Sequence, residues 1–200
     1  MAGVFEEVPG GGAAVVLDEV EIAILRSLAV QLLELVGPGD QPAAGEDPLA
    51  ALFAEGPSEA PADPALARLF PDGYGDPQAD PEDAHEREVR ANSAEFRRFT
   101  ENDLRDRKRE DALAVVRSLD SLATAGERGA VLKLADDECK RWLGTLNDLR
   151  LTIGTRLEVT DEDENGELYR LPDSDPRKPM VMAYLWLGAL QESLVETLMP

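Results

Sequence analysis

The chain has 200 residues, of which 41 are acidic and 20 are basic, so its formal net charge at pH 7 is −21. This length suits one domain, a single Cys excludes an intramolecular disulfide, and one Cys with one His all but excludes a zinc site of nitrogen and sulfur ligands. No apolar run reaches the roughly 20 residues that span a bilayer, and the first residues lack the basic start of a secretory signal. We therefore expect a soluble, cytoplasmic protein without a membrane segment, in which residues 1–200 form a single domain.

The acidic side chains are concentrated in the first part of the chain. Residues 1–86 hold 18 acidic and two basic side chains, whereas residues 87–120 hold nine basic and eight acidic ones. Because DNA affinity depends on neutralising phosphates, we expect the isolated protein to bind duplex DNA weakly or not at all. The acidic surface either keeps the chain in solution or attracts a protein partner, and the composition favours the first interpretation.

A small β element is predicted near the N-terminus. Residues 4–8 and 13–17 can form a hairpin across a Pro-Gly pair, and residues 130–134 alternate like another short strand. The strands at 13–17 and 130–134 each lead directly into a helix, which makes them candidates to pair with each other.

The first helix has a well-marked start and end. Asp18 and Glu21 have the three-residue spacing of a capping box, in which each side chain accepts a hydrogen bond from the backbone N–H of the other residue. Apolar residues then recur at intervals of three and four up to Val36, after which a Gly-Pro pair ends the helix. We expect this helix to pack in the core.

Residues 37–86 form an acidic insertion that is rich in Pro and Gly. They contain nine of the 14 prolines and 12 acidic residues, a composition that buries too little apolar surface to offset the entropy of ordering. Two apolar islands, 48–53 and 64–70, each begin at the Pro of an Asp-Pro pair, which is a common helix start. We predict a partly disordered insertion with two short helices that dock on the core.

A long helix is predicted over residues 82–122. Phe96 and Phe99 anchor its first part, and apolar residues between Ala112 and Leu119 anchor its last part. Leu104 is the only large apolar residue of the intervening stretch, residues 101–111, so we expect that stretch to face mostly the solvent, at least in the monomer.

A cluster of positive charge lies in this stretch and just before it. One interpretation is a solvated helix face on which acidic residues pair with basic residues four positions on, as Glu101 would with Arg105 and Asp103 with Arg107. The other is a docking surface for an acidic protein partner or, with less support, for DNA phosphates. The candidate partner-binding residues are Arg97, Arg98, Arg105, Arg107, Lys108 and Arg109.

Two further helices complete the predicted fold. The helix after residue 134 begins with acidic residues, carries an apolar stripe and ends near Val159. The last helix runs from Pro179 to Met199, and its first half is apolar nearly all round, as in a central core helix. The predicted fold class is therefore mainly α: a compact helical domain with a small β element near the N-terminus, whose short strands feed helices.

No motif in the sequence assembles catalytic or cofactor chemistry. Gly-rich phosphate loops, nucleophile elbows, zinc-protease motifs and EF-hand loops are all absent. His85 has acidic neighbours that could make it a general acid–base group, but a surface helix residue is the favoured interpretation. The acidic stretch 161–164 lacks the ligand spacing of a calcium loop and is interpreted as solvated. We expect no catalytic residue, no metal or other cofactor and no enzyme activity.

Cys139 lies in the first turn of a predicted helix, and two interpretations stay open. The helix N-terminus favours a reactive thiolate, whereas the three preceding acidic residues oppose it. The residue also lies on the apolar stripe, one turn before Trp142, where a buried Cys packs as a small inert side chain. Packing is the favoured role, and a redox thiol is the alternative.

Several strings together resemble a known family. WLGTLNDLRLTIGTRLEV at 142–159 and EFRRFTENDLRDRK at 95–108 are the more specific ones, and DPLAAL, DPALARLFPD and YLWLGALQESLV accompany them. Their order and spacing are similar to those of the actinobacterial AosR-like family, which was long described only as a domain of unknown function and of which one branch is an oxidative-stress transcriptional regulator. The resemblance covers residues 15–198.

The resemblance implies a cytoplasmic regulator of the oxidative-stress response that acts with a sigma factor and RNA polymerase. The redox switch of the regulator branch is an N-terminal Cys pair, and residues 4–12 of this chain contain no Cys. Either Cys139 senses oxidant alone, through a sulfenate or an intersubunit bond, or this chain is not a direct sensor. The alternative function is a non-enzymatic adaptor or scaffold unrelated to transcription, and the oligomeric state is left open.

Overall fold

The computed structural model describes residues 3–37, 55–75, 83–122, 129–160, 166 and 168–199. The predicted fold class is confirmed, because helices dominate and a small antiparallel sheet of three strands lies near the N-terminus. The strands and helices are β1 (Glu6–Glu7), β2 (Ala13–Leu17), α1 (Glu19–Val36), α3 (Pro64–Leu69), α4 (Ala84–Leu122), β3 (Ala130–Leu134), α5 (Asp136–Arg156), a 3₁₀ turn η2 (Leu168–Arg170) and α6 (Lys178–Leu198).

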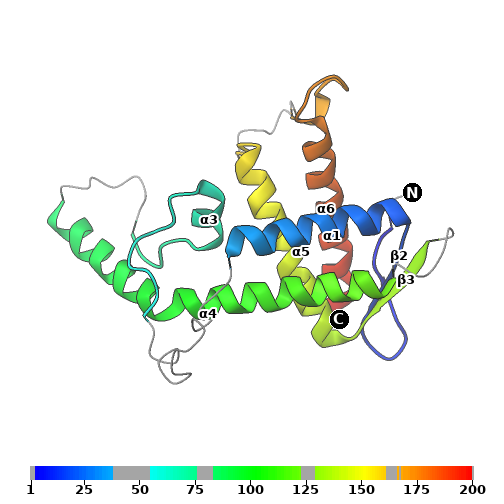
Figure 1. Ribbon diagram of the computed structural model, residues 1–200, viewed down its shortest axis with the longest axis horizontal. Helices are drawn as coiled ribbons and strands as arrows, with labels where there is room; N and C mark the ends of the chain where they lie inside the picture. Colours follow the sequence, from blue (N-terminus) through cyan, green and yellow to red (C-terminus); the bar gives the residue numbers. More distant parts are fainter. Residues whose placement is uncertain are drawn as a thin grey trace, which may run out of the picture.

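Two antiparallel helix pairs make up the body of the molecule. Helix α1 lies along the C-terminal half of α4, with Arg26 paired to Asp120 near one end and Val36 bonded to Arg105 near the other. Helices α5 and α6 form the second pair and cross the first at a steep angle (Figure 1). The N-terminal part of α4 extends beyond the end of α1 (Figure 1), and α3 packs on α5.

The sheet closes one end of the helix pairs. Strand β2 is central, with β1 and β3 antiparallel on either side, so the predicted hairpin and the pairing of residues 13–17 with 130–134 are confirmed. Alternate residues of β2 and β3 point into the core. Each of these two strands leads directly into a helix, α1 or α5.

The start and end of α1 follow the predicted chemistry. The Glu21 N–H donates to Asp18 Oδ1 at 2.8 Å, and the Asp18 N–H donates to Glu21 Oε2 at 2.9 Å, which completes the capping box. The helix ends at Val36, and the next residue, Gly37, has a φ of +86°, in the left-handed region that favours glycine.

The remaining helices agree with the predictions apart from small shifts at their ends. Helix α3 begins at Pro64 with Asp63 as its N-cap, whereas the island at 48–53 lies outside the described residues. Helix α5 ends at Arg156, three residues before the predicted end. No helix in the described ranges is long and apolar enough to cross a membrane.

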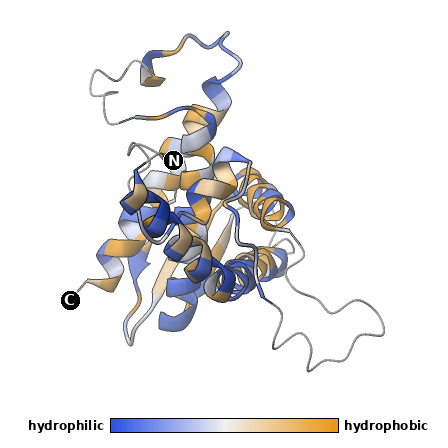
Figure 2. Ribbon diagram, turned by 90° about the vertical axis from the view of Figure 1, so that its left-hand side faces the viewer, coloured by the Kyte–Doolittle hydropathy of each residue, from blue (hydrophilic) through white to orange (hydrophobic). Residues whose placement is uncertain are grey.

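The core lies where the two helix pairs meet each other and the sheet. Figure 2 shows that the helices are amphipathic, with hydrophobic residues on one side and hydrophilic residues on the other. The prediction that Phe96 and Phe99 anchor α4 to this core is wrong, because both rings are exposed. The largest fully buried side chains are Trp142, Phe70, Leu17, Leu25, Leu32, Leu119, Leu146, Leu187, Leu190, Leu194, Val15 and Val181.

Replacing Gly12 tests the packing of the hairpin against β3. Both Gly10 and Gly12 have positive φ, but a Cβ at Gly12 would lie 2.1 Å from the Leu134 carbonyl oxygen, whereas a Cβ at Gly10 would meet nothing within 4 Å. We expect Gly12→Ala to lower the free energy of unfolding by about 1–3 kcal/mol more than Gly10→Ala, because only the former adds a steric clash. Urea denaturation of both variants measures the free energy of unfolding. Equal losses of stability would contradict the close approach of Gly12 to Leu134 that the register of β2 with β3 produces.

Candidate functional site

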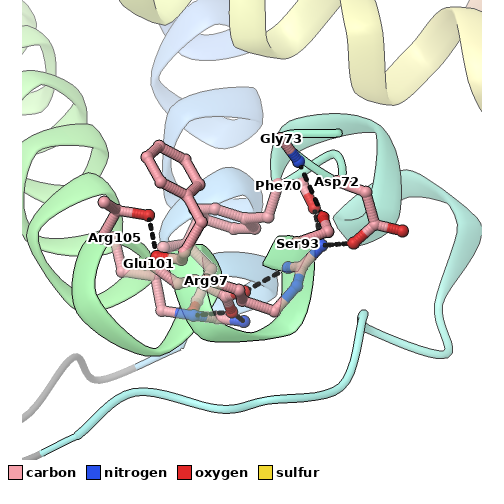
Figure 3. A network of polar contacts seen from close by, with 10 residues as sticks. Phe70, Asp72, Gly73, Ser93, Arg97, Glu101 and Arg105 are labelled. Atoms are coloured by element: carbon pink, nitrogen blue, oxygen red, sulfur yellow. Dashed lines mark hydrogen bonds and ion pairs between the residues drawn. The ribbon is translucent and has the colours of Figure 1, made fainter. Parts of the chain in front are cut away.

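A buried ionic network joins α4 to the segment that follows α3 (Figure 3). The Arg97 side chain is only 4% exposed. Its Nη2 donates to the Phe70 carbonyl oxygen at 2.9 Å and to Asp72 Oδ1 at 2.8 Å, and its Nη1 donates to Glu101 Oε2. One guanidinium thus holds a backbone carbonyl and two carboxylates together.

Glu101 is the centre of this network, with a side chain that is 3% exposed. Its Oε2 accepts from Arg97, and its Oε1 accepts from Arg105 Nε at 2.9 Å and from Arg105 Nη2 at 2.7 Å. Arg105 also donates from Nη1 to the Val36 carbonyl oxygen at 2.7 Å and lies 4.4 Å from the centre of the Phe70 ring. The network therefore connects the end of α1 with α4 and the end of α3.

Attraction between the opposite charges of the network opposes the free-energy cost of burying them. Burial lowers the pKa of the Arg97 guanidinium, but hydrogen bonds and charge attraction from Asp72 and Glu101 outweigh it, so the pKa is raised. Arg97 therefore stays charged, and two guanidinium groups face the buried carboxylate of Glu101. A buried charge that loses its partner of opposite charge destabilises the fold. Arg97, Glu101 and Arg105 therefore stabilise the protein only when all three are present.

A second ion pair, with a buried carboxylate and a partly buried ammonium group, lies further along α4. Lys108 Nζ donates to Asp148 Oδ1 on α5 at 2.6 Å. Burial raises the pKa of Asp148, and the hydrogen bond and charge of Lys108 oppose that rise. Arg109 donates to the Gly37 carbonyl oxygen, so both side chains tie α4 to its neighbours.

The structure distributes the predicted basic cluster between the interior and the surface. The expectation that residues 101–111 mostly face the solvent is wrong for Glu101, which is buried in the network. Arg97, just before this stretch, is buried as well, so it does not lie on a solvated helix face. The predicted pair of Glu101 with Arg105 is confirmed, whereas Asp103 and Arg107, both among the described residues, form no ion pair with each other. Arg98 is partly exposed and pairs with Glu55, while Arg107 is exposed and makes no hydrogen bond or ion pair within the described ranges.

An aromatic groove of about 690 Å³ lies beside the network, on the extended part of α4. We define it by Tyr74, Val89, Glu95, Phe96 and Phe99. Tyr74 is 53% exposed, Phe96 45% and Phe99 63%, and the Tyr74 and Phe96 rings meet edge to face with centroids 5.7 Å apart. Clustered exposed aromatic rings are typical of protein–protein interfaces rather than of an isolated surface.

The buried network positions one wall of the aromatic groove. Arg97 holds the Phe70 carbonyl and Asp72, and the Gly73 N–H donates to Ser93 Oγ at 3.1 Å, so the chain just before Tyr74 is fixed to α4 (Figure 3). A Cβ at Gly73 would lie 2.8 Å from Phe96 Cδ1, which shows how closely the backbone approaches the ring.

Sequence reasoning missed the aromatic groove although its signal is in the chain. Val89, Phe96 and Phe99 recur at helical spacing, which equally describes a buried stripe and an exposed one. The structure separates the two cases, because it shows that the neighbouring helix face, with Arg97 and Ser93, is the buried one.

The remaining candidate residues do not join a reactive cluster. Cys139 is fully buried, and burial raises the pKa of its thiol, with Asp136 and Glu138 adding to the rise. His85 is exposed near the start of α4. The described ranges hold no group of three or more His, Cys, Asp or Glu residues that could bind a metal ion, and the stretch 161–164 lies outside those ranges.

Comparison with known proteins confirms the resemblance found in the sequence. The profile of the family described as "Domain of unknown function (DUF2017)" matches residues 2–198. The protein named oxidative stress regulator AosR from Mycobacterium tuberculosis (strain ATCC 25618 / H37Rv) is 36% identical over 78 residues, which are 39% of this chain and 34% of that protein. The protein named putative oxidative stress regulator AosR from Mycobacterium leprae (strain TN) is 33% identical over 107 residues, 54% of this chain and 45% of that protein.

These matches with the curated relatives are partial. The matching segments span less than half of the length of each of these two proteins. No solved structure matches the chain significantly.

Glu101→Ala tests the buried network. The change leaves Arg97 buried with one of its carboxylate partners removed, so we expect the free energy of unfolding to fall by about 3–5 kcal/mol. Glu110→Ala is the matched control, because Glu110 is an exposed carboxylate on the same helix, and it should change stability by no more than about 0.5 kcal/mol. Urea denaturation of the three proteins measures this, and similar losses in both variants would show that the network contributes no special stability.

The thiol of Cys139 provides a second test. Because it is buried and its pKa is raised, we expect alkylation by iodoacetamide to be much slower in the native protein than in denaturant. Cys139→Ser should lower stability by about 1–3 kcal/mol, because it places a hydroxyl in an apolar site. Peroxide should yield no disulfide-linked dimer on a non-reducing gel. Rapid native alkylation together with such a dimer would instead identify Cys139 as an exposed redox thiol.

Proposed function

This chain belongs to the DUF2017 family, and on that premise we propose that it is a cytoplasmic transcriptional regulator of the oxidative-stress response. The observation that carries the proposal is its similarity to two proteins named as oxidative stress regulators. We propose further that it acts by binding protein, with a sigma factor and RNA polymerase as the partners, rather than as an enzyme.

The aromatic groove is the surface that best supports binding of a protein partner. Its three exposed rings supply apolar area at a low entropic cost, since each ring has few rotatable bonds. The buried network holds the Tyr74 side of the groove in place before a partner arrives, which reduces the cost of ordering on binding. Arg107 lies on the same helix and can add a charged contact from its exposed position.

Fewer side chains of the basic cluster are available to bind a partner than the sequence predicts. Arg97, Arg105 and Lys108 donate hydrogen bonds inside the protein, so reversing their charges would disturb the fold as well as any interface. Within the cluster, Arg107 is the residue whose reversal tests partner binding with little effect on the fold.

Direct contact with DNA is not the proposed mode of action. A net charge of −21 repels phosphates, and several basic side chains of the cluster are engaged internally. The burial of Cys139 also argues that the oxidant signal reaches this protein through a partner.

The second candidate function is an adaptor or scaffold outside transcription. The aromatic groove supports it equally well, because the groove predicts a protein partner and not the identity of that partner. A transcription assay is therefore needed to separate the two functions.

The test uses the tagged full chain in cells before and after peroxide treatment. We expect a sigma factor and RNA polymerase subunits to co-purify, and we expect the Phe96→Ser/Phe99→Ser variant to capture at least about tenfold less of them, since interface aromatic residues often contribute 1.4 kcal/mol or more. Val20→Ser is the control, because Val20 is an apolar side chain that is 64% exposed on α1.

Two further readouts complete this test. Transcription of peroxide-induced genes should fall in the groove variant but not in the control. Purified protein should not shift promoter DNA at nanomolar concentration in about 150 mM salt. Nanomolar sequence-specific DNA binding would contradict the proposed mode of action, and capture of unrelated proteins without a transcriptional effect would favour the adaptor.

A further inference from the structure

A second groove, of about 520 Å³, lies on the α5–α6 pair. Its lining includes Arg150 from α5 and Tyr184, Gly188, Gln191 and Glu192 from α6. This second groove lies on a different helix pair from the aromatic groove. What we infer from it does not depend on the proposed function.

In this second groove the Arg150 side chain extends from α5 to α6 and contacts it. Its Nη1 donates to Gln191 Oε1 at 2.7 Å, and its guanidinium carbon is 5.1 Å from the centre of the Tyr184 ring. A Cβ at Gly188 would lie 3.5 to 3.6 Å from the guanidinium atoms, so a glycine allows this close approach. The Nε of Arg150 is buried without a hydrogen-bond partner, and the side chain forms no ion pair with the described residues.

A complementary negative charge lies on the same face. Glu192 is exposed, one turn along α6 from Gly188, and forms no ion pair within the described part of the chain. The groove thus combines a guanidinium that lacks an acidic partner with a carboxylate that lacks a basic one. A face with both charges is complementary to itself, as the interface of a two-fold dimer must be.

The outer face of α6 also carries apolar side chains. Met182 is 54% exposed and Leu185 39%, and both share one side of the helix with Ala189 and Glu192 at intervals of three and four. This spacing is the one by which two helices pack along a common seam.

We propose that the second groove pairs with the same groove of a second copy of this chain, with the two α6 helices antiparallel about a two-fold axis near Ala189. In a parallel pairing Glu192 would face Glu192, which like-charge repulsion disfavours. The antiparallel pairing brings Glu192 of one copy toward Arg150 of the other and aligns the helix dipoles favourably. Met182 and Leu185 then lose their solvent exposure.

Charge reversal in the full-length chain tests this pairing, with sedimentation equilibrium as the measurement. We expect a dimer with a dissociation constant in the micromolar range or below, and we expect Arg150→Glu and Glu192→Arg each to raise that constant at least about tenfold. An equimolar mixture of the two variants should recover dimers, because in the mixed dimer each substituted side chain of one copy faces an opposite charge on the other. Glu34→Arg, an exposed charge reversal on α1, is the control and should leave the constant unchanged.

A further variant keeps the test valid if Arg150→Glu does not fold, as circular dichroism would show. Ala189→Glu changes an exposed residue and places two like charges at the axis, so it should also yield monomers. A wild-type chain that stays monomeric at high micromolar concentration would overturn the proposal. Dimers that persist in Glu192→Arg and Ala189→Glu would overturn it too, and so would two folded, monomeric charge-reversal variants that fail to combine.

Discussion

A carboxylate buried between two guanidinium groups holds the extended half of α4 against the rest of the molecule. Glu101 accepts from Arg97 on one side and from Arg105 on the other, and these arginines in turn hold the Phe70 carbonyl and the Val36 carbonyl. Because a buried charge without its partner costs several kcal/mol, the three ions fix the ends of α1 and α3 on α4 together. The shape of the surface above them follows from this constraint.

The buried ionic network supports the surface on which the proposed function depends, because it fixes one wall of the aromatic groove. The chain before Tyr74 is bonded to Arg97 and Ser93, so one wall of the aromatic groove is as rigid as the network beneath it. A preformed groove suits a regulator that must recognise its partner without large ordering costs. The net charge of −21 opposes contact with nucleic acid phosphates, and the proposed pairing of α6 would add a second interaction surface on the other helix pair.

Local sequence chemistry predicts much of the fold, and the errors concern long-range packing. The capping box of Asp18 and Glu21 and the helix start at Pro64 depend on neighbours within a few residues, and both are confirmed. The burial of Arg97 depends on Phe70 and Asp72, which lie 27 and 25 residues earlier in the chain, and no helical periodicity contains that information. For the same reason the helical pattern wrongly places Phe96 in the core, whereas the one carbonyl and two carboxylates around Arg97 hold the other face of α4 inward.

Amide hydrogen exchange in Arg97→Met tests most directly whether the ionic network fixes the groove wall. Met keeps much of the length and the apolar stem of Arg97 but loses the donors to Phe70 and Asp72, while Glu101 keeps Arg105. The account predicts that the amides of Phe70 and Gly73, which donate to the Leu66 carbonyl oxygen and to Ser93 Oγ, exchange at least about tenfold faster than in the wild-type chain, with β2 and α5 unchanged. Unchanged protection of the Phe70 and Gly73 amides in a folded variant would contradict it.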